Sequence, residues 1–262
     1  MDTSKTNQRI WVSGASSGIG AEIARQLSAE GCRLALFARR GEQLESLRLT
    51  LSNPEEVIVH AGDVSDRDAV HRSIESTIEA FGGLDVIYLN AGFGDSFFPE
   101  RFDADLCRRI TEVNYLGALY GIESVMPHFL KRGTGTIVGI SSIAGTRGMP
   151  GAAPYCASKA AFTTFLESLR IDLTGRNIQV TTVNPGFVRT PLTDRNRFPM
   201  PFRLDVEPAV RRILRGVRRG KREVHFPRRL TLLVKTLGLL PGPLYDFVMR
   251  RFGRKKYDKA PS

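Results

Sequence analysis

The sequence predicts an α/β protein built on a doubly wound parallel sheet. Three observations predict it. Short runs alternate with longer stretches of helical periodicity, the runs are mainly apolar, and a glycine-rich turn follows the first of them. Continuously apolar strands are typical of parallel sheets covered by helices on both faces. Right-handed crossovers between such strands produce the doubly wound arrangement.

The first half of the chain alternates strands with helices. Each predicted strand is an apolar run bounded by polar residues or glycine, and each predicted helix has apolar residues three to four positions apart. The strands predicted here are 9–12, 33–38, 57–60 and 84–89, and the helices are 18–29, 43–51 and 66–81.

The second half continues this alternation. It predicts helices over 104–130, 154–174 and 208–216 and strands over 136–140, 179–183 and 223–226. The segment 191–205 is predicted to be a loop, because it contains three prolines and no clear period. We expect a single domain over residues 1–226, followed by an extension over 227–262. The length of 262 residues is ample for such a core.

The charge of the chain is concentrated near its C-terminus. The formal net charge is +11, and residues 195–262 hold 19 Lys and Arg against 5 Asp and Glu, a local excess of +14. Residues 1–194 carry a net charge of −3. The first three-quarters is therefore an ordinary, slightly acidic domain, and any anionic partner is expected to meet the last quarter. We predict no nucleic-acid partner, because no nucleic-acid motif accompanies this charge.

The turn after the first strand has the composition of a phosphate-binding site. It reads Ser13-Gly14-Ala15-Ser16-Ser17-Gly18-Ile19-Gly20 and leads into a predicted helix. Glycines let a backbone approach a pyrophosphate closely, and the helix start presents free N–H groups. The spacing GxxxGxG differs from the general GxGxxG pattern, so glycines placed only for packing are the alternative.

The end of the second predicted strand indicates which dinucleotide would bind. Sites for NAD place an acidic side chain there for the ribose 2′-hydroxyl. This chain has Arg39 and Arg40 instead, whose guanidinium groups suit a 2′-phosphate. We therefore predict NADP(H) as the cofactor, with solvated loop charges as the alternative. No metal site is predicted.

A candidate catalytic set of three residues follows the fifth predicted strand. Tyr155 and Lys159 lie four positions apart, so they share one face of a helix, and Ser142 precedes them. Lowering the pKa of a tyrosine by about 3 units takes about 4 kcal/mol, and a buried ammonium beside the phenol favours the phenolate. The Ser142 hydroxyl can bind a substrate oxygen next to the tyrosine.

The chain resembles the short-chain dehydrogenase/reductase family over roughly residues 8–190. The resemblance rests on the glycine turn, the set Ser142, Tyr155 and Lys159, and four further motifs in order. These are Asp63-Val64, Asn90-Ala91-Gly92, Asn114 and Asn184-Pro185-Gly186. Position 13 is serine where the family more often has threonine, and a hydroxyl is retained.

This resemblance implies a Rossmann fold and a role for each matched residue. Asp63 would bond the adenine amino group, and Asn90 would support the sheet and cofactor. Val64, Ala91 and Gly92 would be further cofactor-binding residues. Asn114 would hold a water that links Lys159 to solvent. Pro185, Gly186 and Val188 would flank the nicotinamide, and Thr190 would contact its carboxamide. Tyr155 would exchange a proton with the substrate oxygen while a hydride passes between the nicotinamide and the carbonyl carbon.

The substrate is expected to be lipophilic. The loops expected around the site carry largely apolar residues, which favours a hydrophobic ketone or alcohol. The candidate substrate-binding residues are Phe93, Phe97, Ile143, Met149, Phe187 and Phe198. A reductase of 3-oxoacyl thioesters and a non-catalytic cofactor-binding scaffold are the alternatives, and the intact catalytic set argues against the scaffold.

The extension combines apolar helical faces with arginines. Leu230, Leu233, Val234 and Leu237 share one face of a helix, as do Leu244, Phe247, Val248 and Phe252. Each piece is too short to span a bilayer. Peripheral contact with anionic lipid is one interpretation. Packing against the pocket or within a homodimer or homotetramer is a second, and contact with an acidic carrier protein is a third.

The remaining features concern location. Three widely spaced cysteines show no disulfide framework, which predicts a reducing compartment. The polar segment 1–8 lacks a secretory apolar region. We therefore expect a cytoplasmic protein with possible membrane association.

Overall fold

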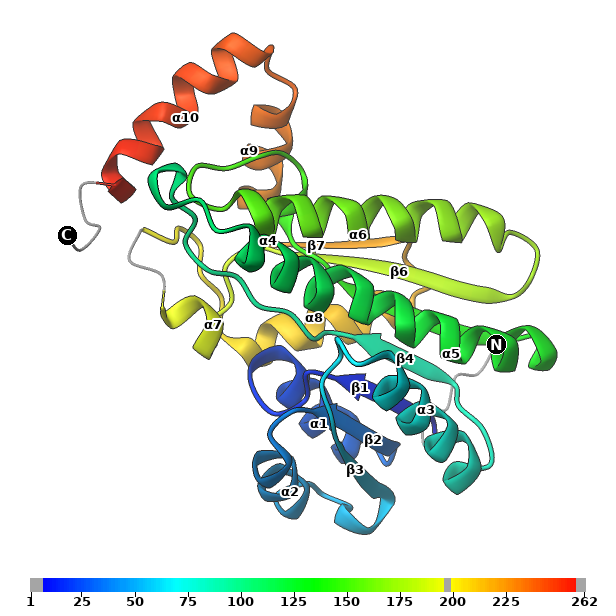
Figure 1. The fold of residues 1–262 in the computed structure, drawn as a ribbon. Coiled ribbons are helices and arrows are strands. Elements are labelled where there is room, and N and C mark those ends of the chain that lie inside the picture. The colour runs from blue at the N-terminus through cyan, green and yellow to red at the C-terminus, as the bar shows by residue number, and fades with distance from the viewer. Residues whose placement is uncertain (1–6, 196–198, 258–262) are drawn as a thin grey trace.

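The computed structural model describes residues 7–195 and 199–257, and for 252–257 only the course of the backbone. Its centre is a seven-stranded parallel sheet in the order β3-β2-β1-β4-β5-β6-β7. The strands are β1 (Arg9–Ser13), β2 (Arg33–Ala38), β3 (Val57–Ala61), β4 (Val86–Leu89), β5 (Gly135–Ile140), β6 (Ile178–Pro185) and β7 (Glu223–Phe226). The predicted doubly wound sheet is confirmed (Figure 1).

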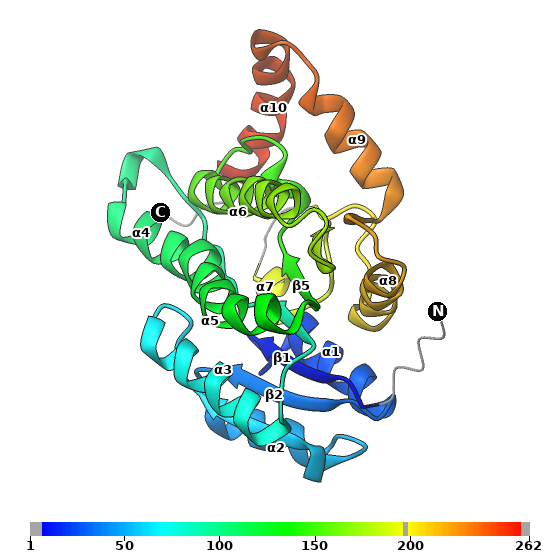
Figure 2. The same cartoon turned by 90° about the vertical axis from the view of Figure 1, so that its right-hand side faces the viewer.

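Helices cover both faces of the sheet (Figure 2). Side chains of β1 alternate between two buried clusters: Ile10 and Val12 belong to one, and Trp11 belongs to the other. The first cluster includes residues of α1 (Gly18–Ala29), α2 (Gly41–Leu49) and α8 (Val206–Arg218). The second includes residues of α3 (Arg67–Phe81), α5 (Gly117–Arg132) and α6 (Ala153–Asp172). Helix α4 (Ala104–Thr111) buries Ile110.

The predicted helix over 104–130 contains an irregular turn. Helices α4 and α5 are joined through a π-helical turn over Glu112–Leu116. Asn114 lies in this turn and is buried. The apolar period of the sequence does not distinguish this turn from a regular helix, because a π-turn inserts only one residue.

The predicted loop 191–205 begins with a short helix, α7 (Pro191–Asp194). The side chains and backbone of Thr190 and Thr193 form a capping box around its first turn. Pro191 stands at the first helical position, where its missing N–H costs nothing. The prediction of a loop is therefore wrong for residues 191–194, because Pro191 starts a helix there.

The C-terminal extension folds as two helices, α9 (Arg228–Gly238) and α10 (Gly242–Tyr257). They form a V that lies beside α6, beyond the edge strand β7 (Figures 1 and 2). Arg147, in the loop before α6, holds the V through hydrogen bonds from Nη1 to the carbonyl oxygens of Gly238 (2.9 Å) and Leu240 (2.7 Å). Among the described residues, we find no helix both long enough and apolar enough to cross a membrane.

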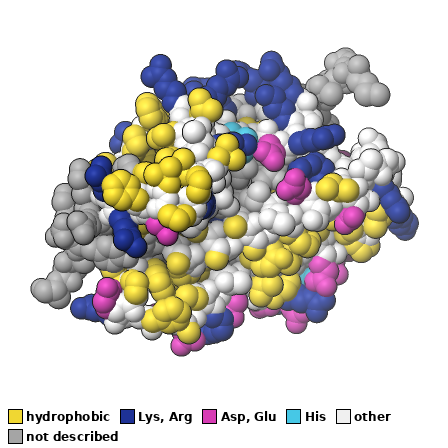
Figure 3. Space-filling model, turned by 90° about the horizontal axis from the view of Figure 1, so that it is seen from above, with side chains coloured by type: hydrophobic (Ala, Val, Ile, Leu, Met, Phe, Trp, Pro, Cys, Tyr) yellow, Lys and Arg dark blue, Asp and Glu magenta, His cyan; other side chains and the backbone are white. Residues whose placement is uncertain are grey.

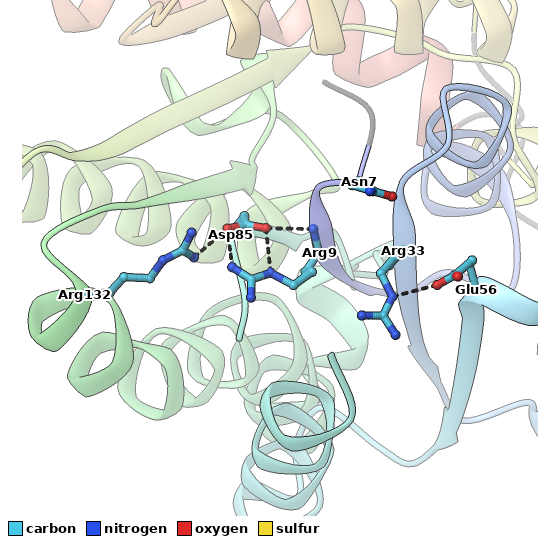
Figure 4. Close-up of a pocket in the computed structure, with 6 residues that line it drawn as sticks. All are labelled: Asn7, Arg9, Arg33, Glu56, Asp85 and Arg132. Carbon is cyan, nitrogen blue, oxygen red and sulfur yellow. Dashed lines mark hydrogen bonds and ion pairs between the residues drawn. The ribbon is translucent and has the colours of Figure 1, made fainter. Parts of the chain in front are cut away.

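Ion pairs lie at the amino ends of the strands (Figure 4). The carboxylate of Asp85 accepts hydrogen bonds from the backbone N–H, Nε and Nη2 of Arg9, at 2.8, 2.9 and 2.8 Å. Arg132 approaches the same carboxylate at 2.5 Å, and Arg33 pairs with Glu56 at 2.6 Å. These contacts tie β1 to the chain before β4 and β2 to the chain before β3.

Candidate active site

A cavity of about 250 Å³ opens at the carboxyl edge of the sheet. The strand order reverses between β1 and β4, which is where doubly wound sheets bind their ligands. The predicted cofactor residues that line the cavity are Gly14, Ser16, Ser17, Gly18, Ile19, Arg39, Arg40, Asp63, Val64, Asn90, Ala91, Gly92, Tyr155, Lys159, Pro185, Gly186, Val188 and Thr190.

Gly20 is a predicted cofactor residue with a packing role in this structure. A Cβ at Gly20 would lie 2.4 Å from the carbonyl oxygen of Gly14, so the helix start could not approach the turn with any side chain there. Gly14 itself has a φ of +63°, and a Cβ there would lie 2.8 Å from Cα of Ala91. The two glycines therefore serve close backbone packing as well as the cavity.

Ser13 and Asn90 join the glycine turn to the end of β4. The Ser13 Oγ accepts hydrogen bonds from the backbone N–H of Asn90 (3.0 Å) and of Ala91 (3.2 Å). The Asn90 side chain donates back to the carbonyl oxygens of Ser13 (3.1 Å) and Gly14 (3.2 Å). Because these contacts need only a hydroxyl at position 13, they explain how serine serves there.

Two arginines stand at one end of the cavity, after β2. Arg40 donates from Nη2 to the hydroxyl oxygens of Ser16 (2.8 Å) and Ser17 (2.9 Å), so it reaches across to the glycine turn. Arg39 is largely exposed, and its Nη1 lies 3.7 Å from the carboxylate of Asp63. Both guanidinium groups line the cavity, and neither forms a buried ion pair within the part of the chain that the structure describes.

Lys159 is buried beside the other end of the cavity. Its Nζ donates to the carbonyl oxygen of Ile140 at 3.0 Å, and its side chain is 3% exposed. Burial lowers the pKa of this ammonium group to about 8. Ile140 is its one hydrogen-bond acceptor among the described residues, so further N–H groups remain for a ligand in the cavity.

Tyr155 and Ser142 lie together at the same end. Burial raises the pKa of the Tyr155 phenol, and a hydrogen bond from Ser142 opposes the rise. The Nζ of Lys159 is 5.9 Å from the centre of the tyrosine ring. The sequence led us to expect a lowered tyrosine pKa, but in the protein without a bound cofactor the pKa of Tyr155 is raised. Burial of the phenol outweighs the hydrogen bond that stabilises the phenolate.

Gly94 is a residue of this site that sequence reasoning missed. A Cβ at this position would lie 2.9 Å from Cδ2 of Tyr155 and 3.3 Å from its Cγ. The backbone of Gly94 therefore packs directly on the tyrosine ring. The only available signal was its place two residues after the Asn90-Ala91-Gly92 motif.

Asn114 connects the loop after β4 with the catalytic helix α6. Its Oδ1 accepts from the backbone N–H of Phe93 at 2.8 Å, and its Nδ2 donates to the carbonyl oxygen of Phe93 at 2.9 Å. The same Nδ2 donates to the Ser158 hydroxyl at 3.1 Å, and that hydroxyl donates to the carbonyl oxygen of Tyr155. In this structure Asn114 acts as a structural bridge between the two segments.

The predicted substrate residues lie at different distances from the cavity. Phe93 lines it, and so does Leu192, the first residue after Pro191. Phe97 packs edge-on against Phe102, with 5.3 Å between ring centroids. Ile143, Met149 and Phe187 are not among the residues that line the cavity in the described part of the chain, and Phe198 lies outside that part.

The residues present fit a dinucleotide. The glycine turn packs closely on the end of β4 because its glycines carry no Cβ, and the start of α1, at Gly18 and Ile19, lines the cavity with backbone N–H groups. At the far end, the buried Lys159 keeps donor capacity facing the cavity. The cavity thus offers a phosphate cradle at its middle and acid–base groups at one end.

Comparison with known proteins agrees with this arrangement. Residues 8–199 match the family model described as short chain dehydrogenase. A protein of Myxococcus xanthus named "Uncharacterized oxidoreductase" is 40% identical over 92% of this chain and 95% of its own length. An "11-beta-hydroxysteroid dehydrogenase" of Pinus massoniana is 34% identical over 83% of this chain and 66% of its own.

A solved structure shows the same fold. A short chain dehydrogenase/reductase from Burkholderia phymatum, in complex with NAD, superposes with a TM-score of 0.81 at 23% identity. The match covers 88% of this chain and 93% of that one. Fold, cavity and family match agree, and the chain belongs to the short-chain dehydrogenase/reductase family of oxidoreductases.

Proposed function

We propose that this protein is an NADPH-dependent reductase of a lipophilic ketone or aldehyde. The observation that carries the proposal is the arrangement of the cavity lining. Arg39 and Arg40 follow β2, whereas Ser142 follows β5, three strands away in the sheet, beside Tyr155 and Lys159. A dinucleotide lying between them would bring its nicotinamide to the tyrosine and its ribose phosphate to the arginines.

The arginines support NADPH over NADH. A 2′-phosphate carries close to two negative charges, and a guanidinium can bind it through two parallel hydrogen bonds. Arg40 already reaches the serines of the phosphate turn, and Arg39 is exposed at the cavity wall. Asp63 lies next to Arg39, where Arg39 offsets its negative charge.

The catalytic end has the groups needed for carbonyl reduction. Bound NADPH supplies the hydride. Tyr155 donates a proton to the carbonyl oxygen as negative charge develops there, and the Ser142 hydroxyl holds the same oxygen. Lys159 would hold the cofactor ribose through its remaining N–H groups and would stabilise the tyrosinate left after proton transfer.

The pKa of Tyr155 supports the reductive direction. A free tyrosine is already protonated at neutral pH, burial raises the pKa of Tyr155 further, and a protonated phenol is the form that can donate a proton. The steroid dehydrogenase among the relatives supports a lipophilic substrate, and so does Phe93 in the cavity wall.

Cofactor choice is tested by kinetics with NADPH and NADH. Wild-type protein is expected to prefer NADPH, and Arg39→Asp and Arg40→Asp are each expected to reverse or abolish that preference. Arg72→Asp, which changes an exposed arginine on α3, controls for the change in charge. If both site variants keep the wild-type preference, the cofactor proposal is wrong.

Substrate class is tested with a panel of hydrophobic ketones, aldehydes and 3-oxoacyl thioesters, followed by NADPH oxidation. Tyr155→Phe is expected to bind NADPH normally and to lose turnover. A strong preference for the thioesters would favour the acyl-thioester alternative. Normal NADPH binding without turnover of any substrate by the wild-type protein would favour the scaffold alternative.

A further inference from the structure

The outer side of the α9–α10 pair is unusually apolar for a protein surface. In the described part of the chain, eleven large hydrophobic side chains are exposed, and five of them fall within the 16 residues from Leu232 to Phe247. Each of the five is between 49 and 86% exposed, and they are Leu232, Leu233, Leu239, Leu244 and Phe247. We call this set the apolar face. Such concentrations of exposed apolar area mark interaction sites.

The two helices have distinct inner and outer sides. Leu230, Thr231 and Tyr245 are buried against the domain, and Tyr245 donates a hydrogen bond to the carbonyl oxygen of Gly148 at 2.6 Å. Leu232 and Leu239 lie two helical turns apart, and Leu244 and Phe247 lie one turn apart, so each pair shares a side. Seen from above, hydrophobic side chains gather over the part of the molecule where α9 and α10 lie (Figure 3).

Basic residues border the apolar face. Arg228, Arg229, Lys235, Arg250 and Arg251 are exposed on the same two helices. Residues 227–251, whose side chains the structure describes, hold these five Lys and Arg and a single acid, Asp246, which gives a local net charge of +4. The surface therefore combines apolar side chains with a strong positive field.

The positive charge around the apolar face indicates which kind of partner binds there. A symmetric contact between two copies would bring two such positive surfaces together, which is unfavourable over the short distances of an interface. An anionic bilayer meets both demands: its acyl region accepts the leucines, and its headgroups attract arginines by about 1 kcal/mol each. We propose that α9 and α10 bind the protein peripherally to anionic lipid membranes through the apolar face.

This attachment would lie next to the catalytic end of the cavity. Leu230, on the inner side of α9, packs on Gly186. A Cβ added to Gly186 would lie 2.8 Å from Cδ2 of Leu230. Gly186 lines the cavity. One helix would thus separate the bilayer from the cavity wall. The proposal concerns membrane binding and does not depend on the reaction proposed above.

Flotation with lipid vesicles tests the proposal. Full-length protein is expected to float with vesicles of phosphatidylcholine containing phosphatidylserine and to float far less with phosphatidylcholine alone. Leu232→Ser/Leu239→Ser is expected to lower partitioning about 150-fold, which corresponds to about 3 kcal/mol, because two leucine side chains no longer enter the acyl region. The matched control, Leu49→Ser/Ile171→Ser, changes two similarly exposed residues elsewhere and is expected to float like wild type.

A second pair of variants tests the charge. Arg228→Gln/Arg229→Gln is expected to lower partitioning about 30-fold, which corresponds to about 2 kcal/mol. Arg212→Gln/Arg215→Gln removes the same charge from the exposed side of α8 and is expected to have little effect.

Three outcomes would overturn the proposal. These are equal flotation of Leu232→Ser/Leu239→Ser and wild type, equal binding to both vesicle types, and a lipid-free wild-type oligomer that Leu232→Ser/Leu239→Ser converts to a monomer. In the last case the apolar face is a subunit interface. NADPH binding by every variant, measured in the absence of lipid, shows that the domain is folded, so a failure of membrane binding is distinguishable from a failure of the enzyme.

Discussion

The guanidinium of Arg147 lies over the ring of Tyr245, with 4.1 Å between its Cζ and the ring centroid. Arg147 belongs to the loop that leads into the catalytic helix α6, and Tyr245 belongs to α10. The same arginine donates to two carbonyl oxygens at the end of α9, and the tyrosine hydroxyl donates to Gly148. The C-terminal helices are therefore joined to the loop that positions Tyr155.

The first prediction concerns this junction. Arg147→Leu removes the two hydrogen bonds and the stacked charge, and we expect faster hydrogen exchange in α9 and α10 together with a raised KM for the carbonyl substrate. Tyr245→Phe loses one hydrogen bond, worth about 1 kcal/mol, and is expected to show a smaller effect. The KM for NADPH should be unchanged in both. A rise in the NADPH KM alone would contradict this role.

The second prediction concerns Lys159. Its ammonium is buried with one hydrogen-bond acceptor among the described residues, so it destabilises the cofactor-free fold while serving the site. At neutral pH, Lys159→Met is expected to raise the free energy of unfolding by about 1–3 kcal/mol, by thermal or urea denaturation, and to abolish turnover. A less stable Lys159→Met protein would contradict this account.

The same group predicts a pH dependence. The folded pKa of Lys159 is about 8, below the unfolded value of about 10.4. Between these values the unfolded chain holds a proton that the folded protein has released, so cofactor-free stability should rise with pH in this window. Below about pH 8 both states hold the proton, and this contribution is constant. Lys159→Met should lack the rise.

The third prediction concerns Gly94. Gly94→Ala would place a methyl group 2.9 Å from the Tyr155 ring and displace the phenol from its position beside Ser142. Small displacements of reacting groups lower kcat by about ten- to a hundredfold, and NADPH affinity should be retained. Gly148→Ala, in the nearby loop, meets nothing within 4 Å and is the matched control. Equal kcat values for the two variants would remove Gly94 from the positioning of the tyrosine.

The fourth prediction concerns Asp85. Hydrogen bonds from Arg9 and Arg132 outweigh the effect of burial and hold the pKa of this carboxyl at about 2, against about 3.9 unfolded. This depressed pKa contributes about 2 kcal/mol of stability above pH 4, which is lost as the pH falls towards 2. Asp85→Asn should therefore be less stable than wild type at pH 7 and nearly equal to it near pH 2, by urea denaturation.

Glu123 provides the contrast for Asp85. Its pKa is also lowered to about 2, by Arg67 and His71, but its pair is exposed to solvent. Water screens such surface pairs, so Glu123→Gln is expected to change stability much less. If Asp85→Asn and Glu123→Gln lower the free energy of unfolding equally, burial of the Asp85 ion pairs does not increase their contribution to stability.

The sequence predicted the sheet, the glycine turn and the catalytic set because each depends on local order along the chain. Tyr155 and Lys159 share a helix face by spacing alone, and Ser142 follows a mainly apolar strand. The predictions of a homo-oligomer, of the boundary near residue 226 and of a reducing compartment stay predictions.

The features that were missed depend on contacts between distant segments. The packing of Gly94 on Tyr155 needs the loop after β4 to meet α6, and the hold of Arg147 on α9 spans about ninety positions of sequence. Neither contact leaves a periodic signal. The apolar substrate residues were similarly ambiguous, because an aromatic near a strand end has the same pattern whether it faces a cavity, as Phe93 does, or a neighbouring ring, as Phe97 does.

Because Asn114 lies in the π-turn between α4 and α5, the number of residues in this helical segment decides where its side chain points. A π-turn holds one residue more than a regular helix over the same span. Deleting one residue between Glu112 and Asn114 would let the hydrogen-bond ladder become regular, yet it would turn the asparagine by about 100° away from Phe93 and Ser158. Among homologous chains, insertions and deletions in this helix should be far rarer than its exposed surface would suggest.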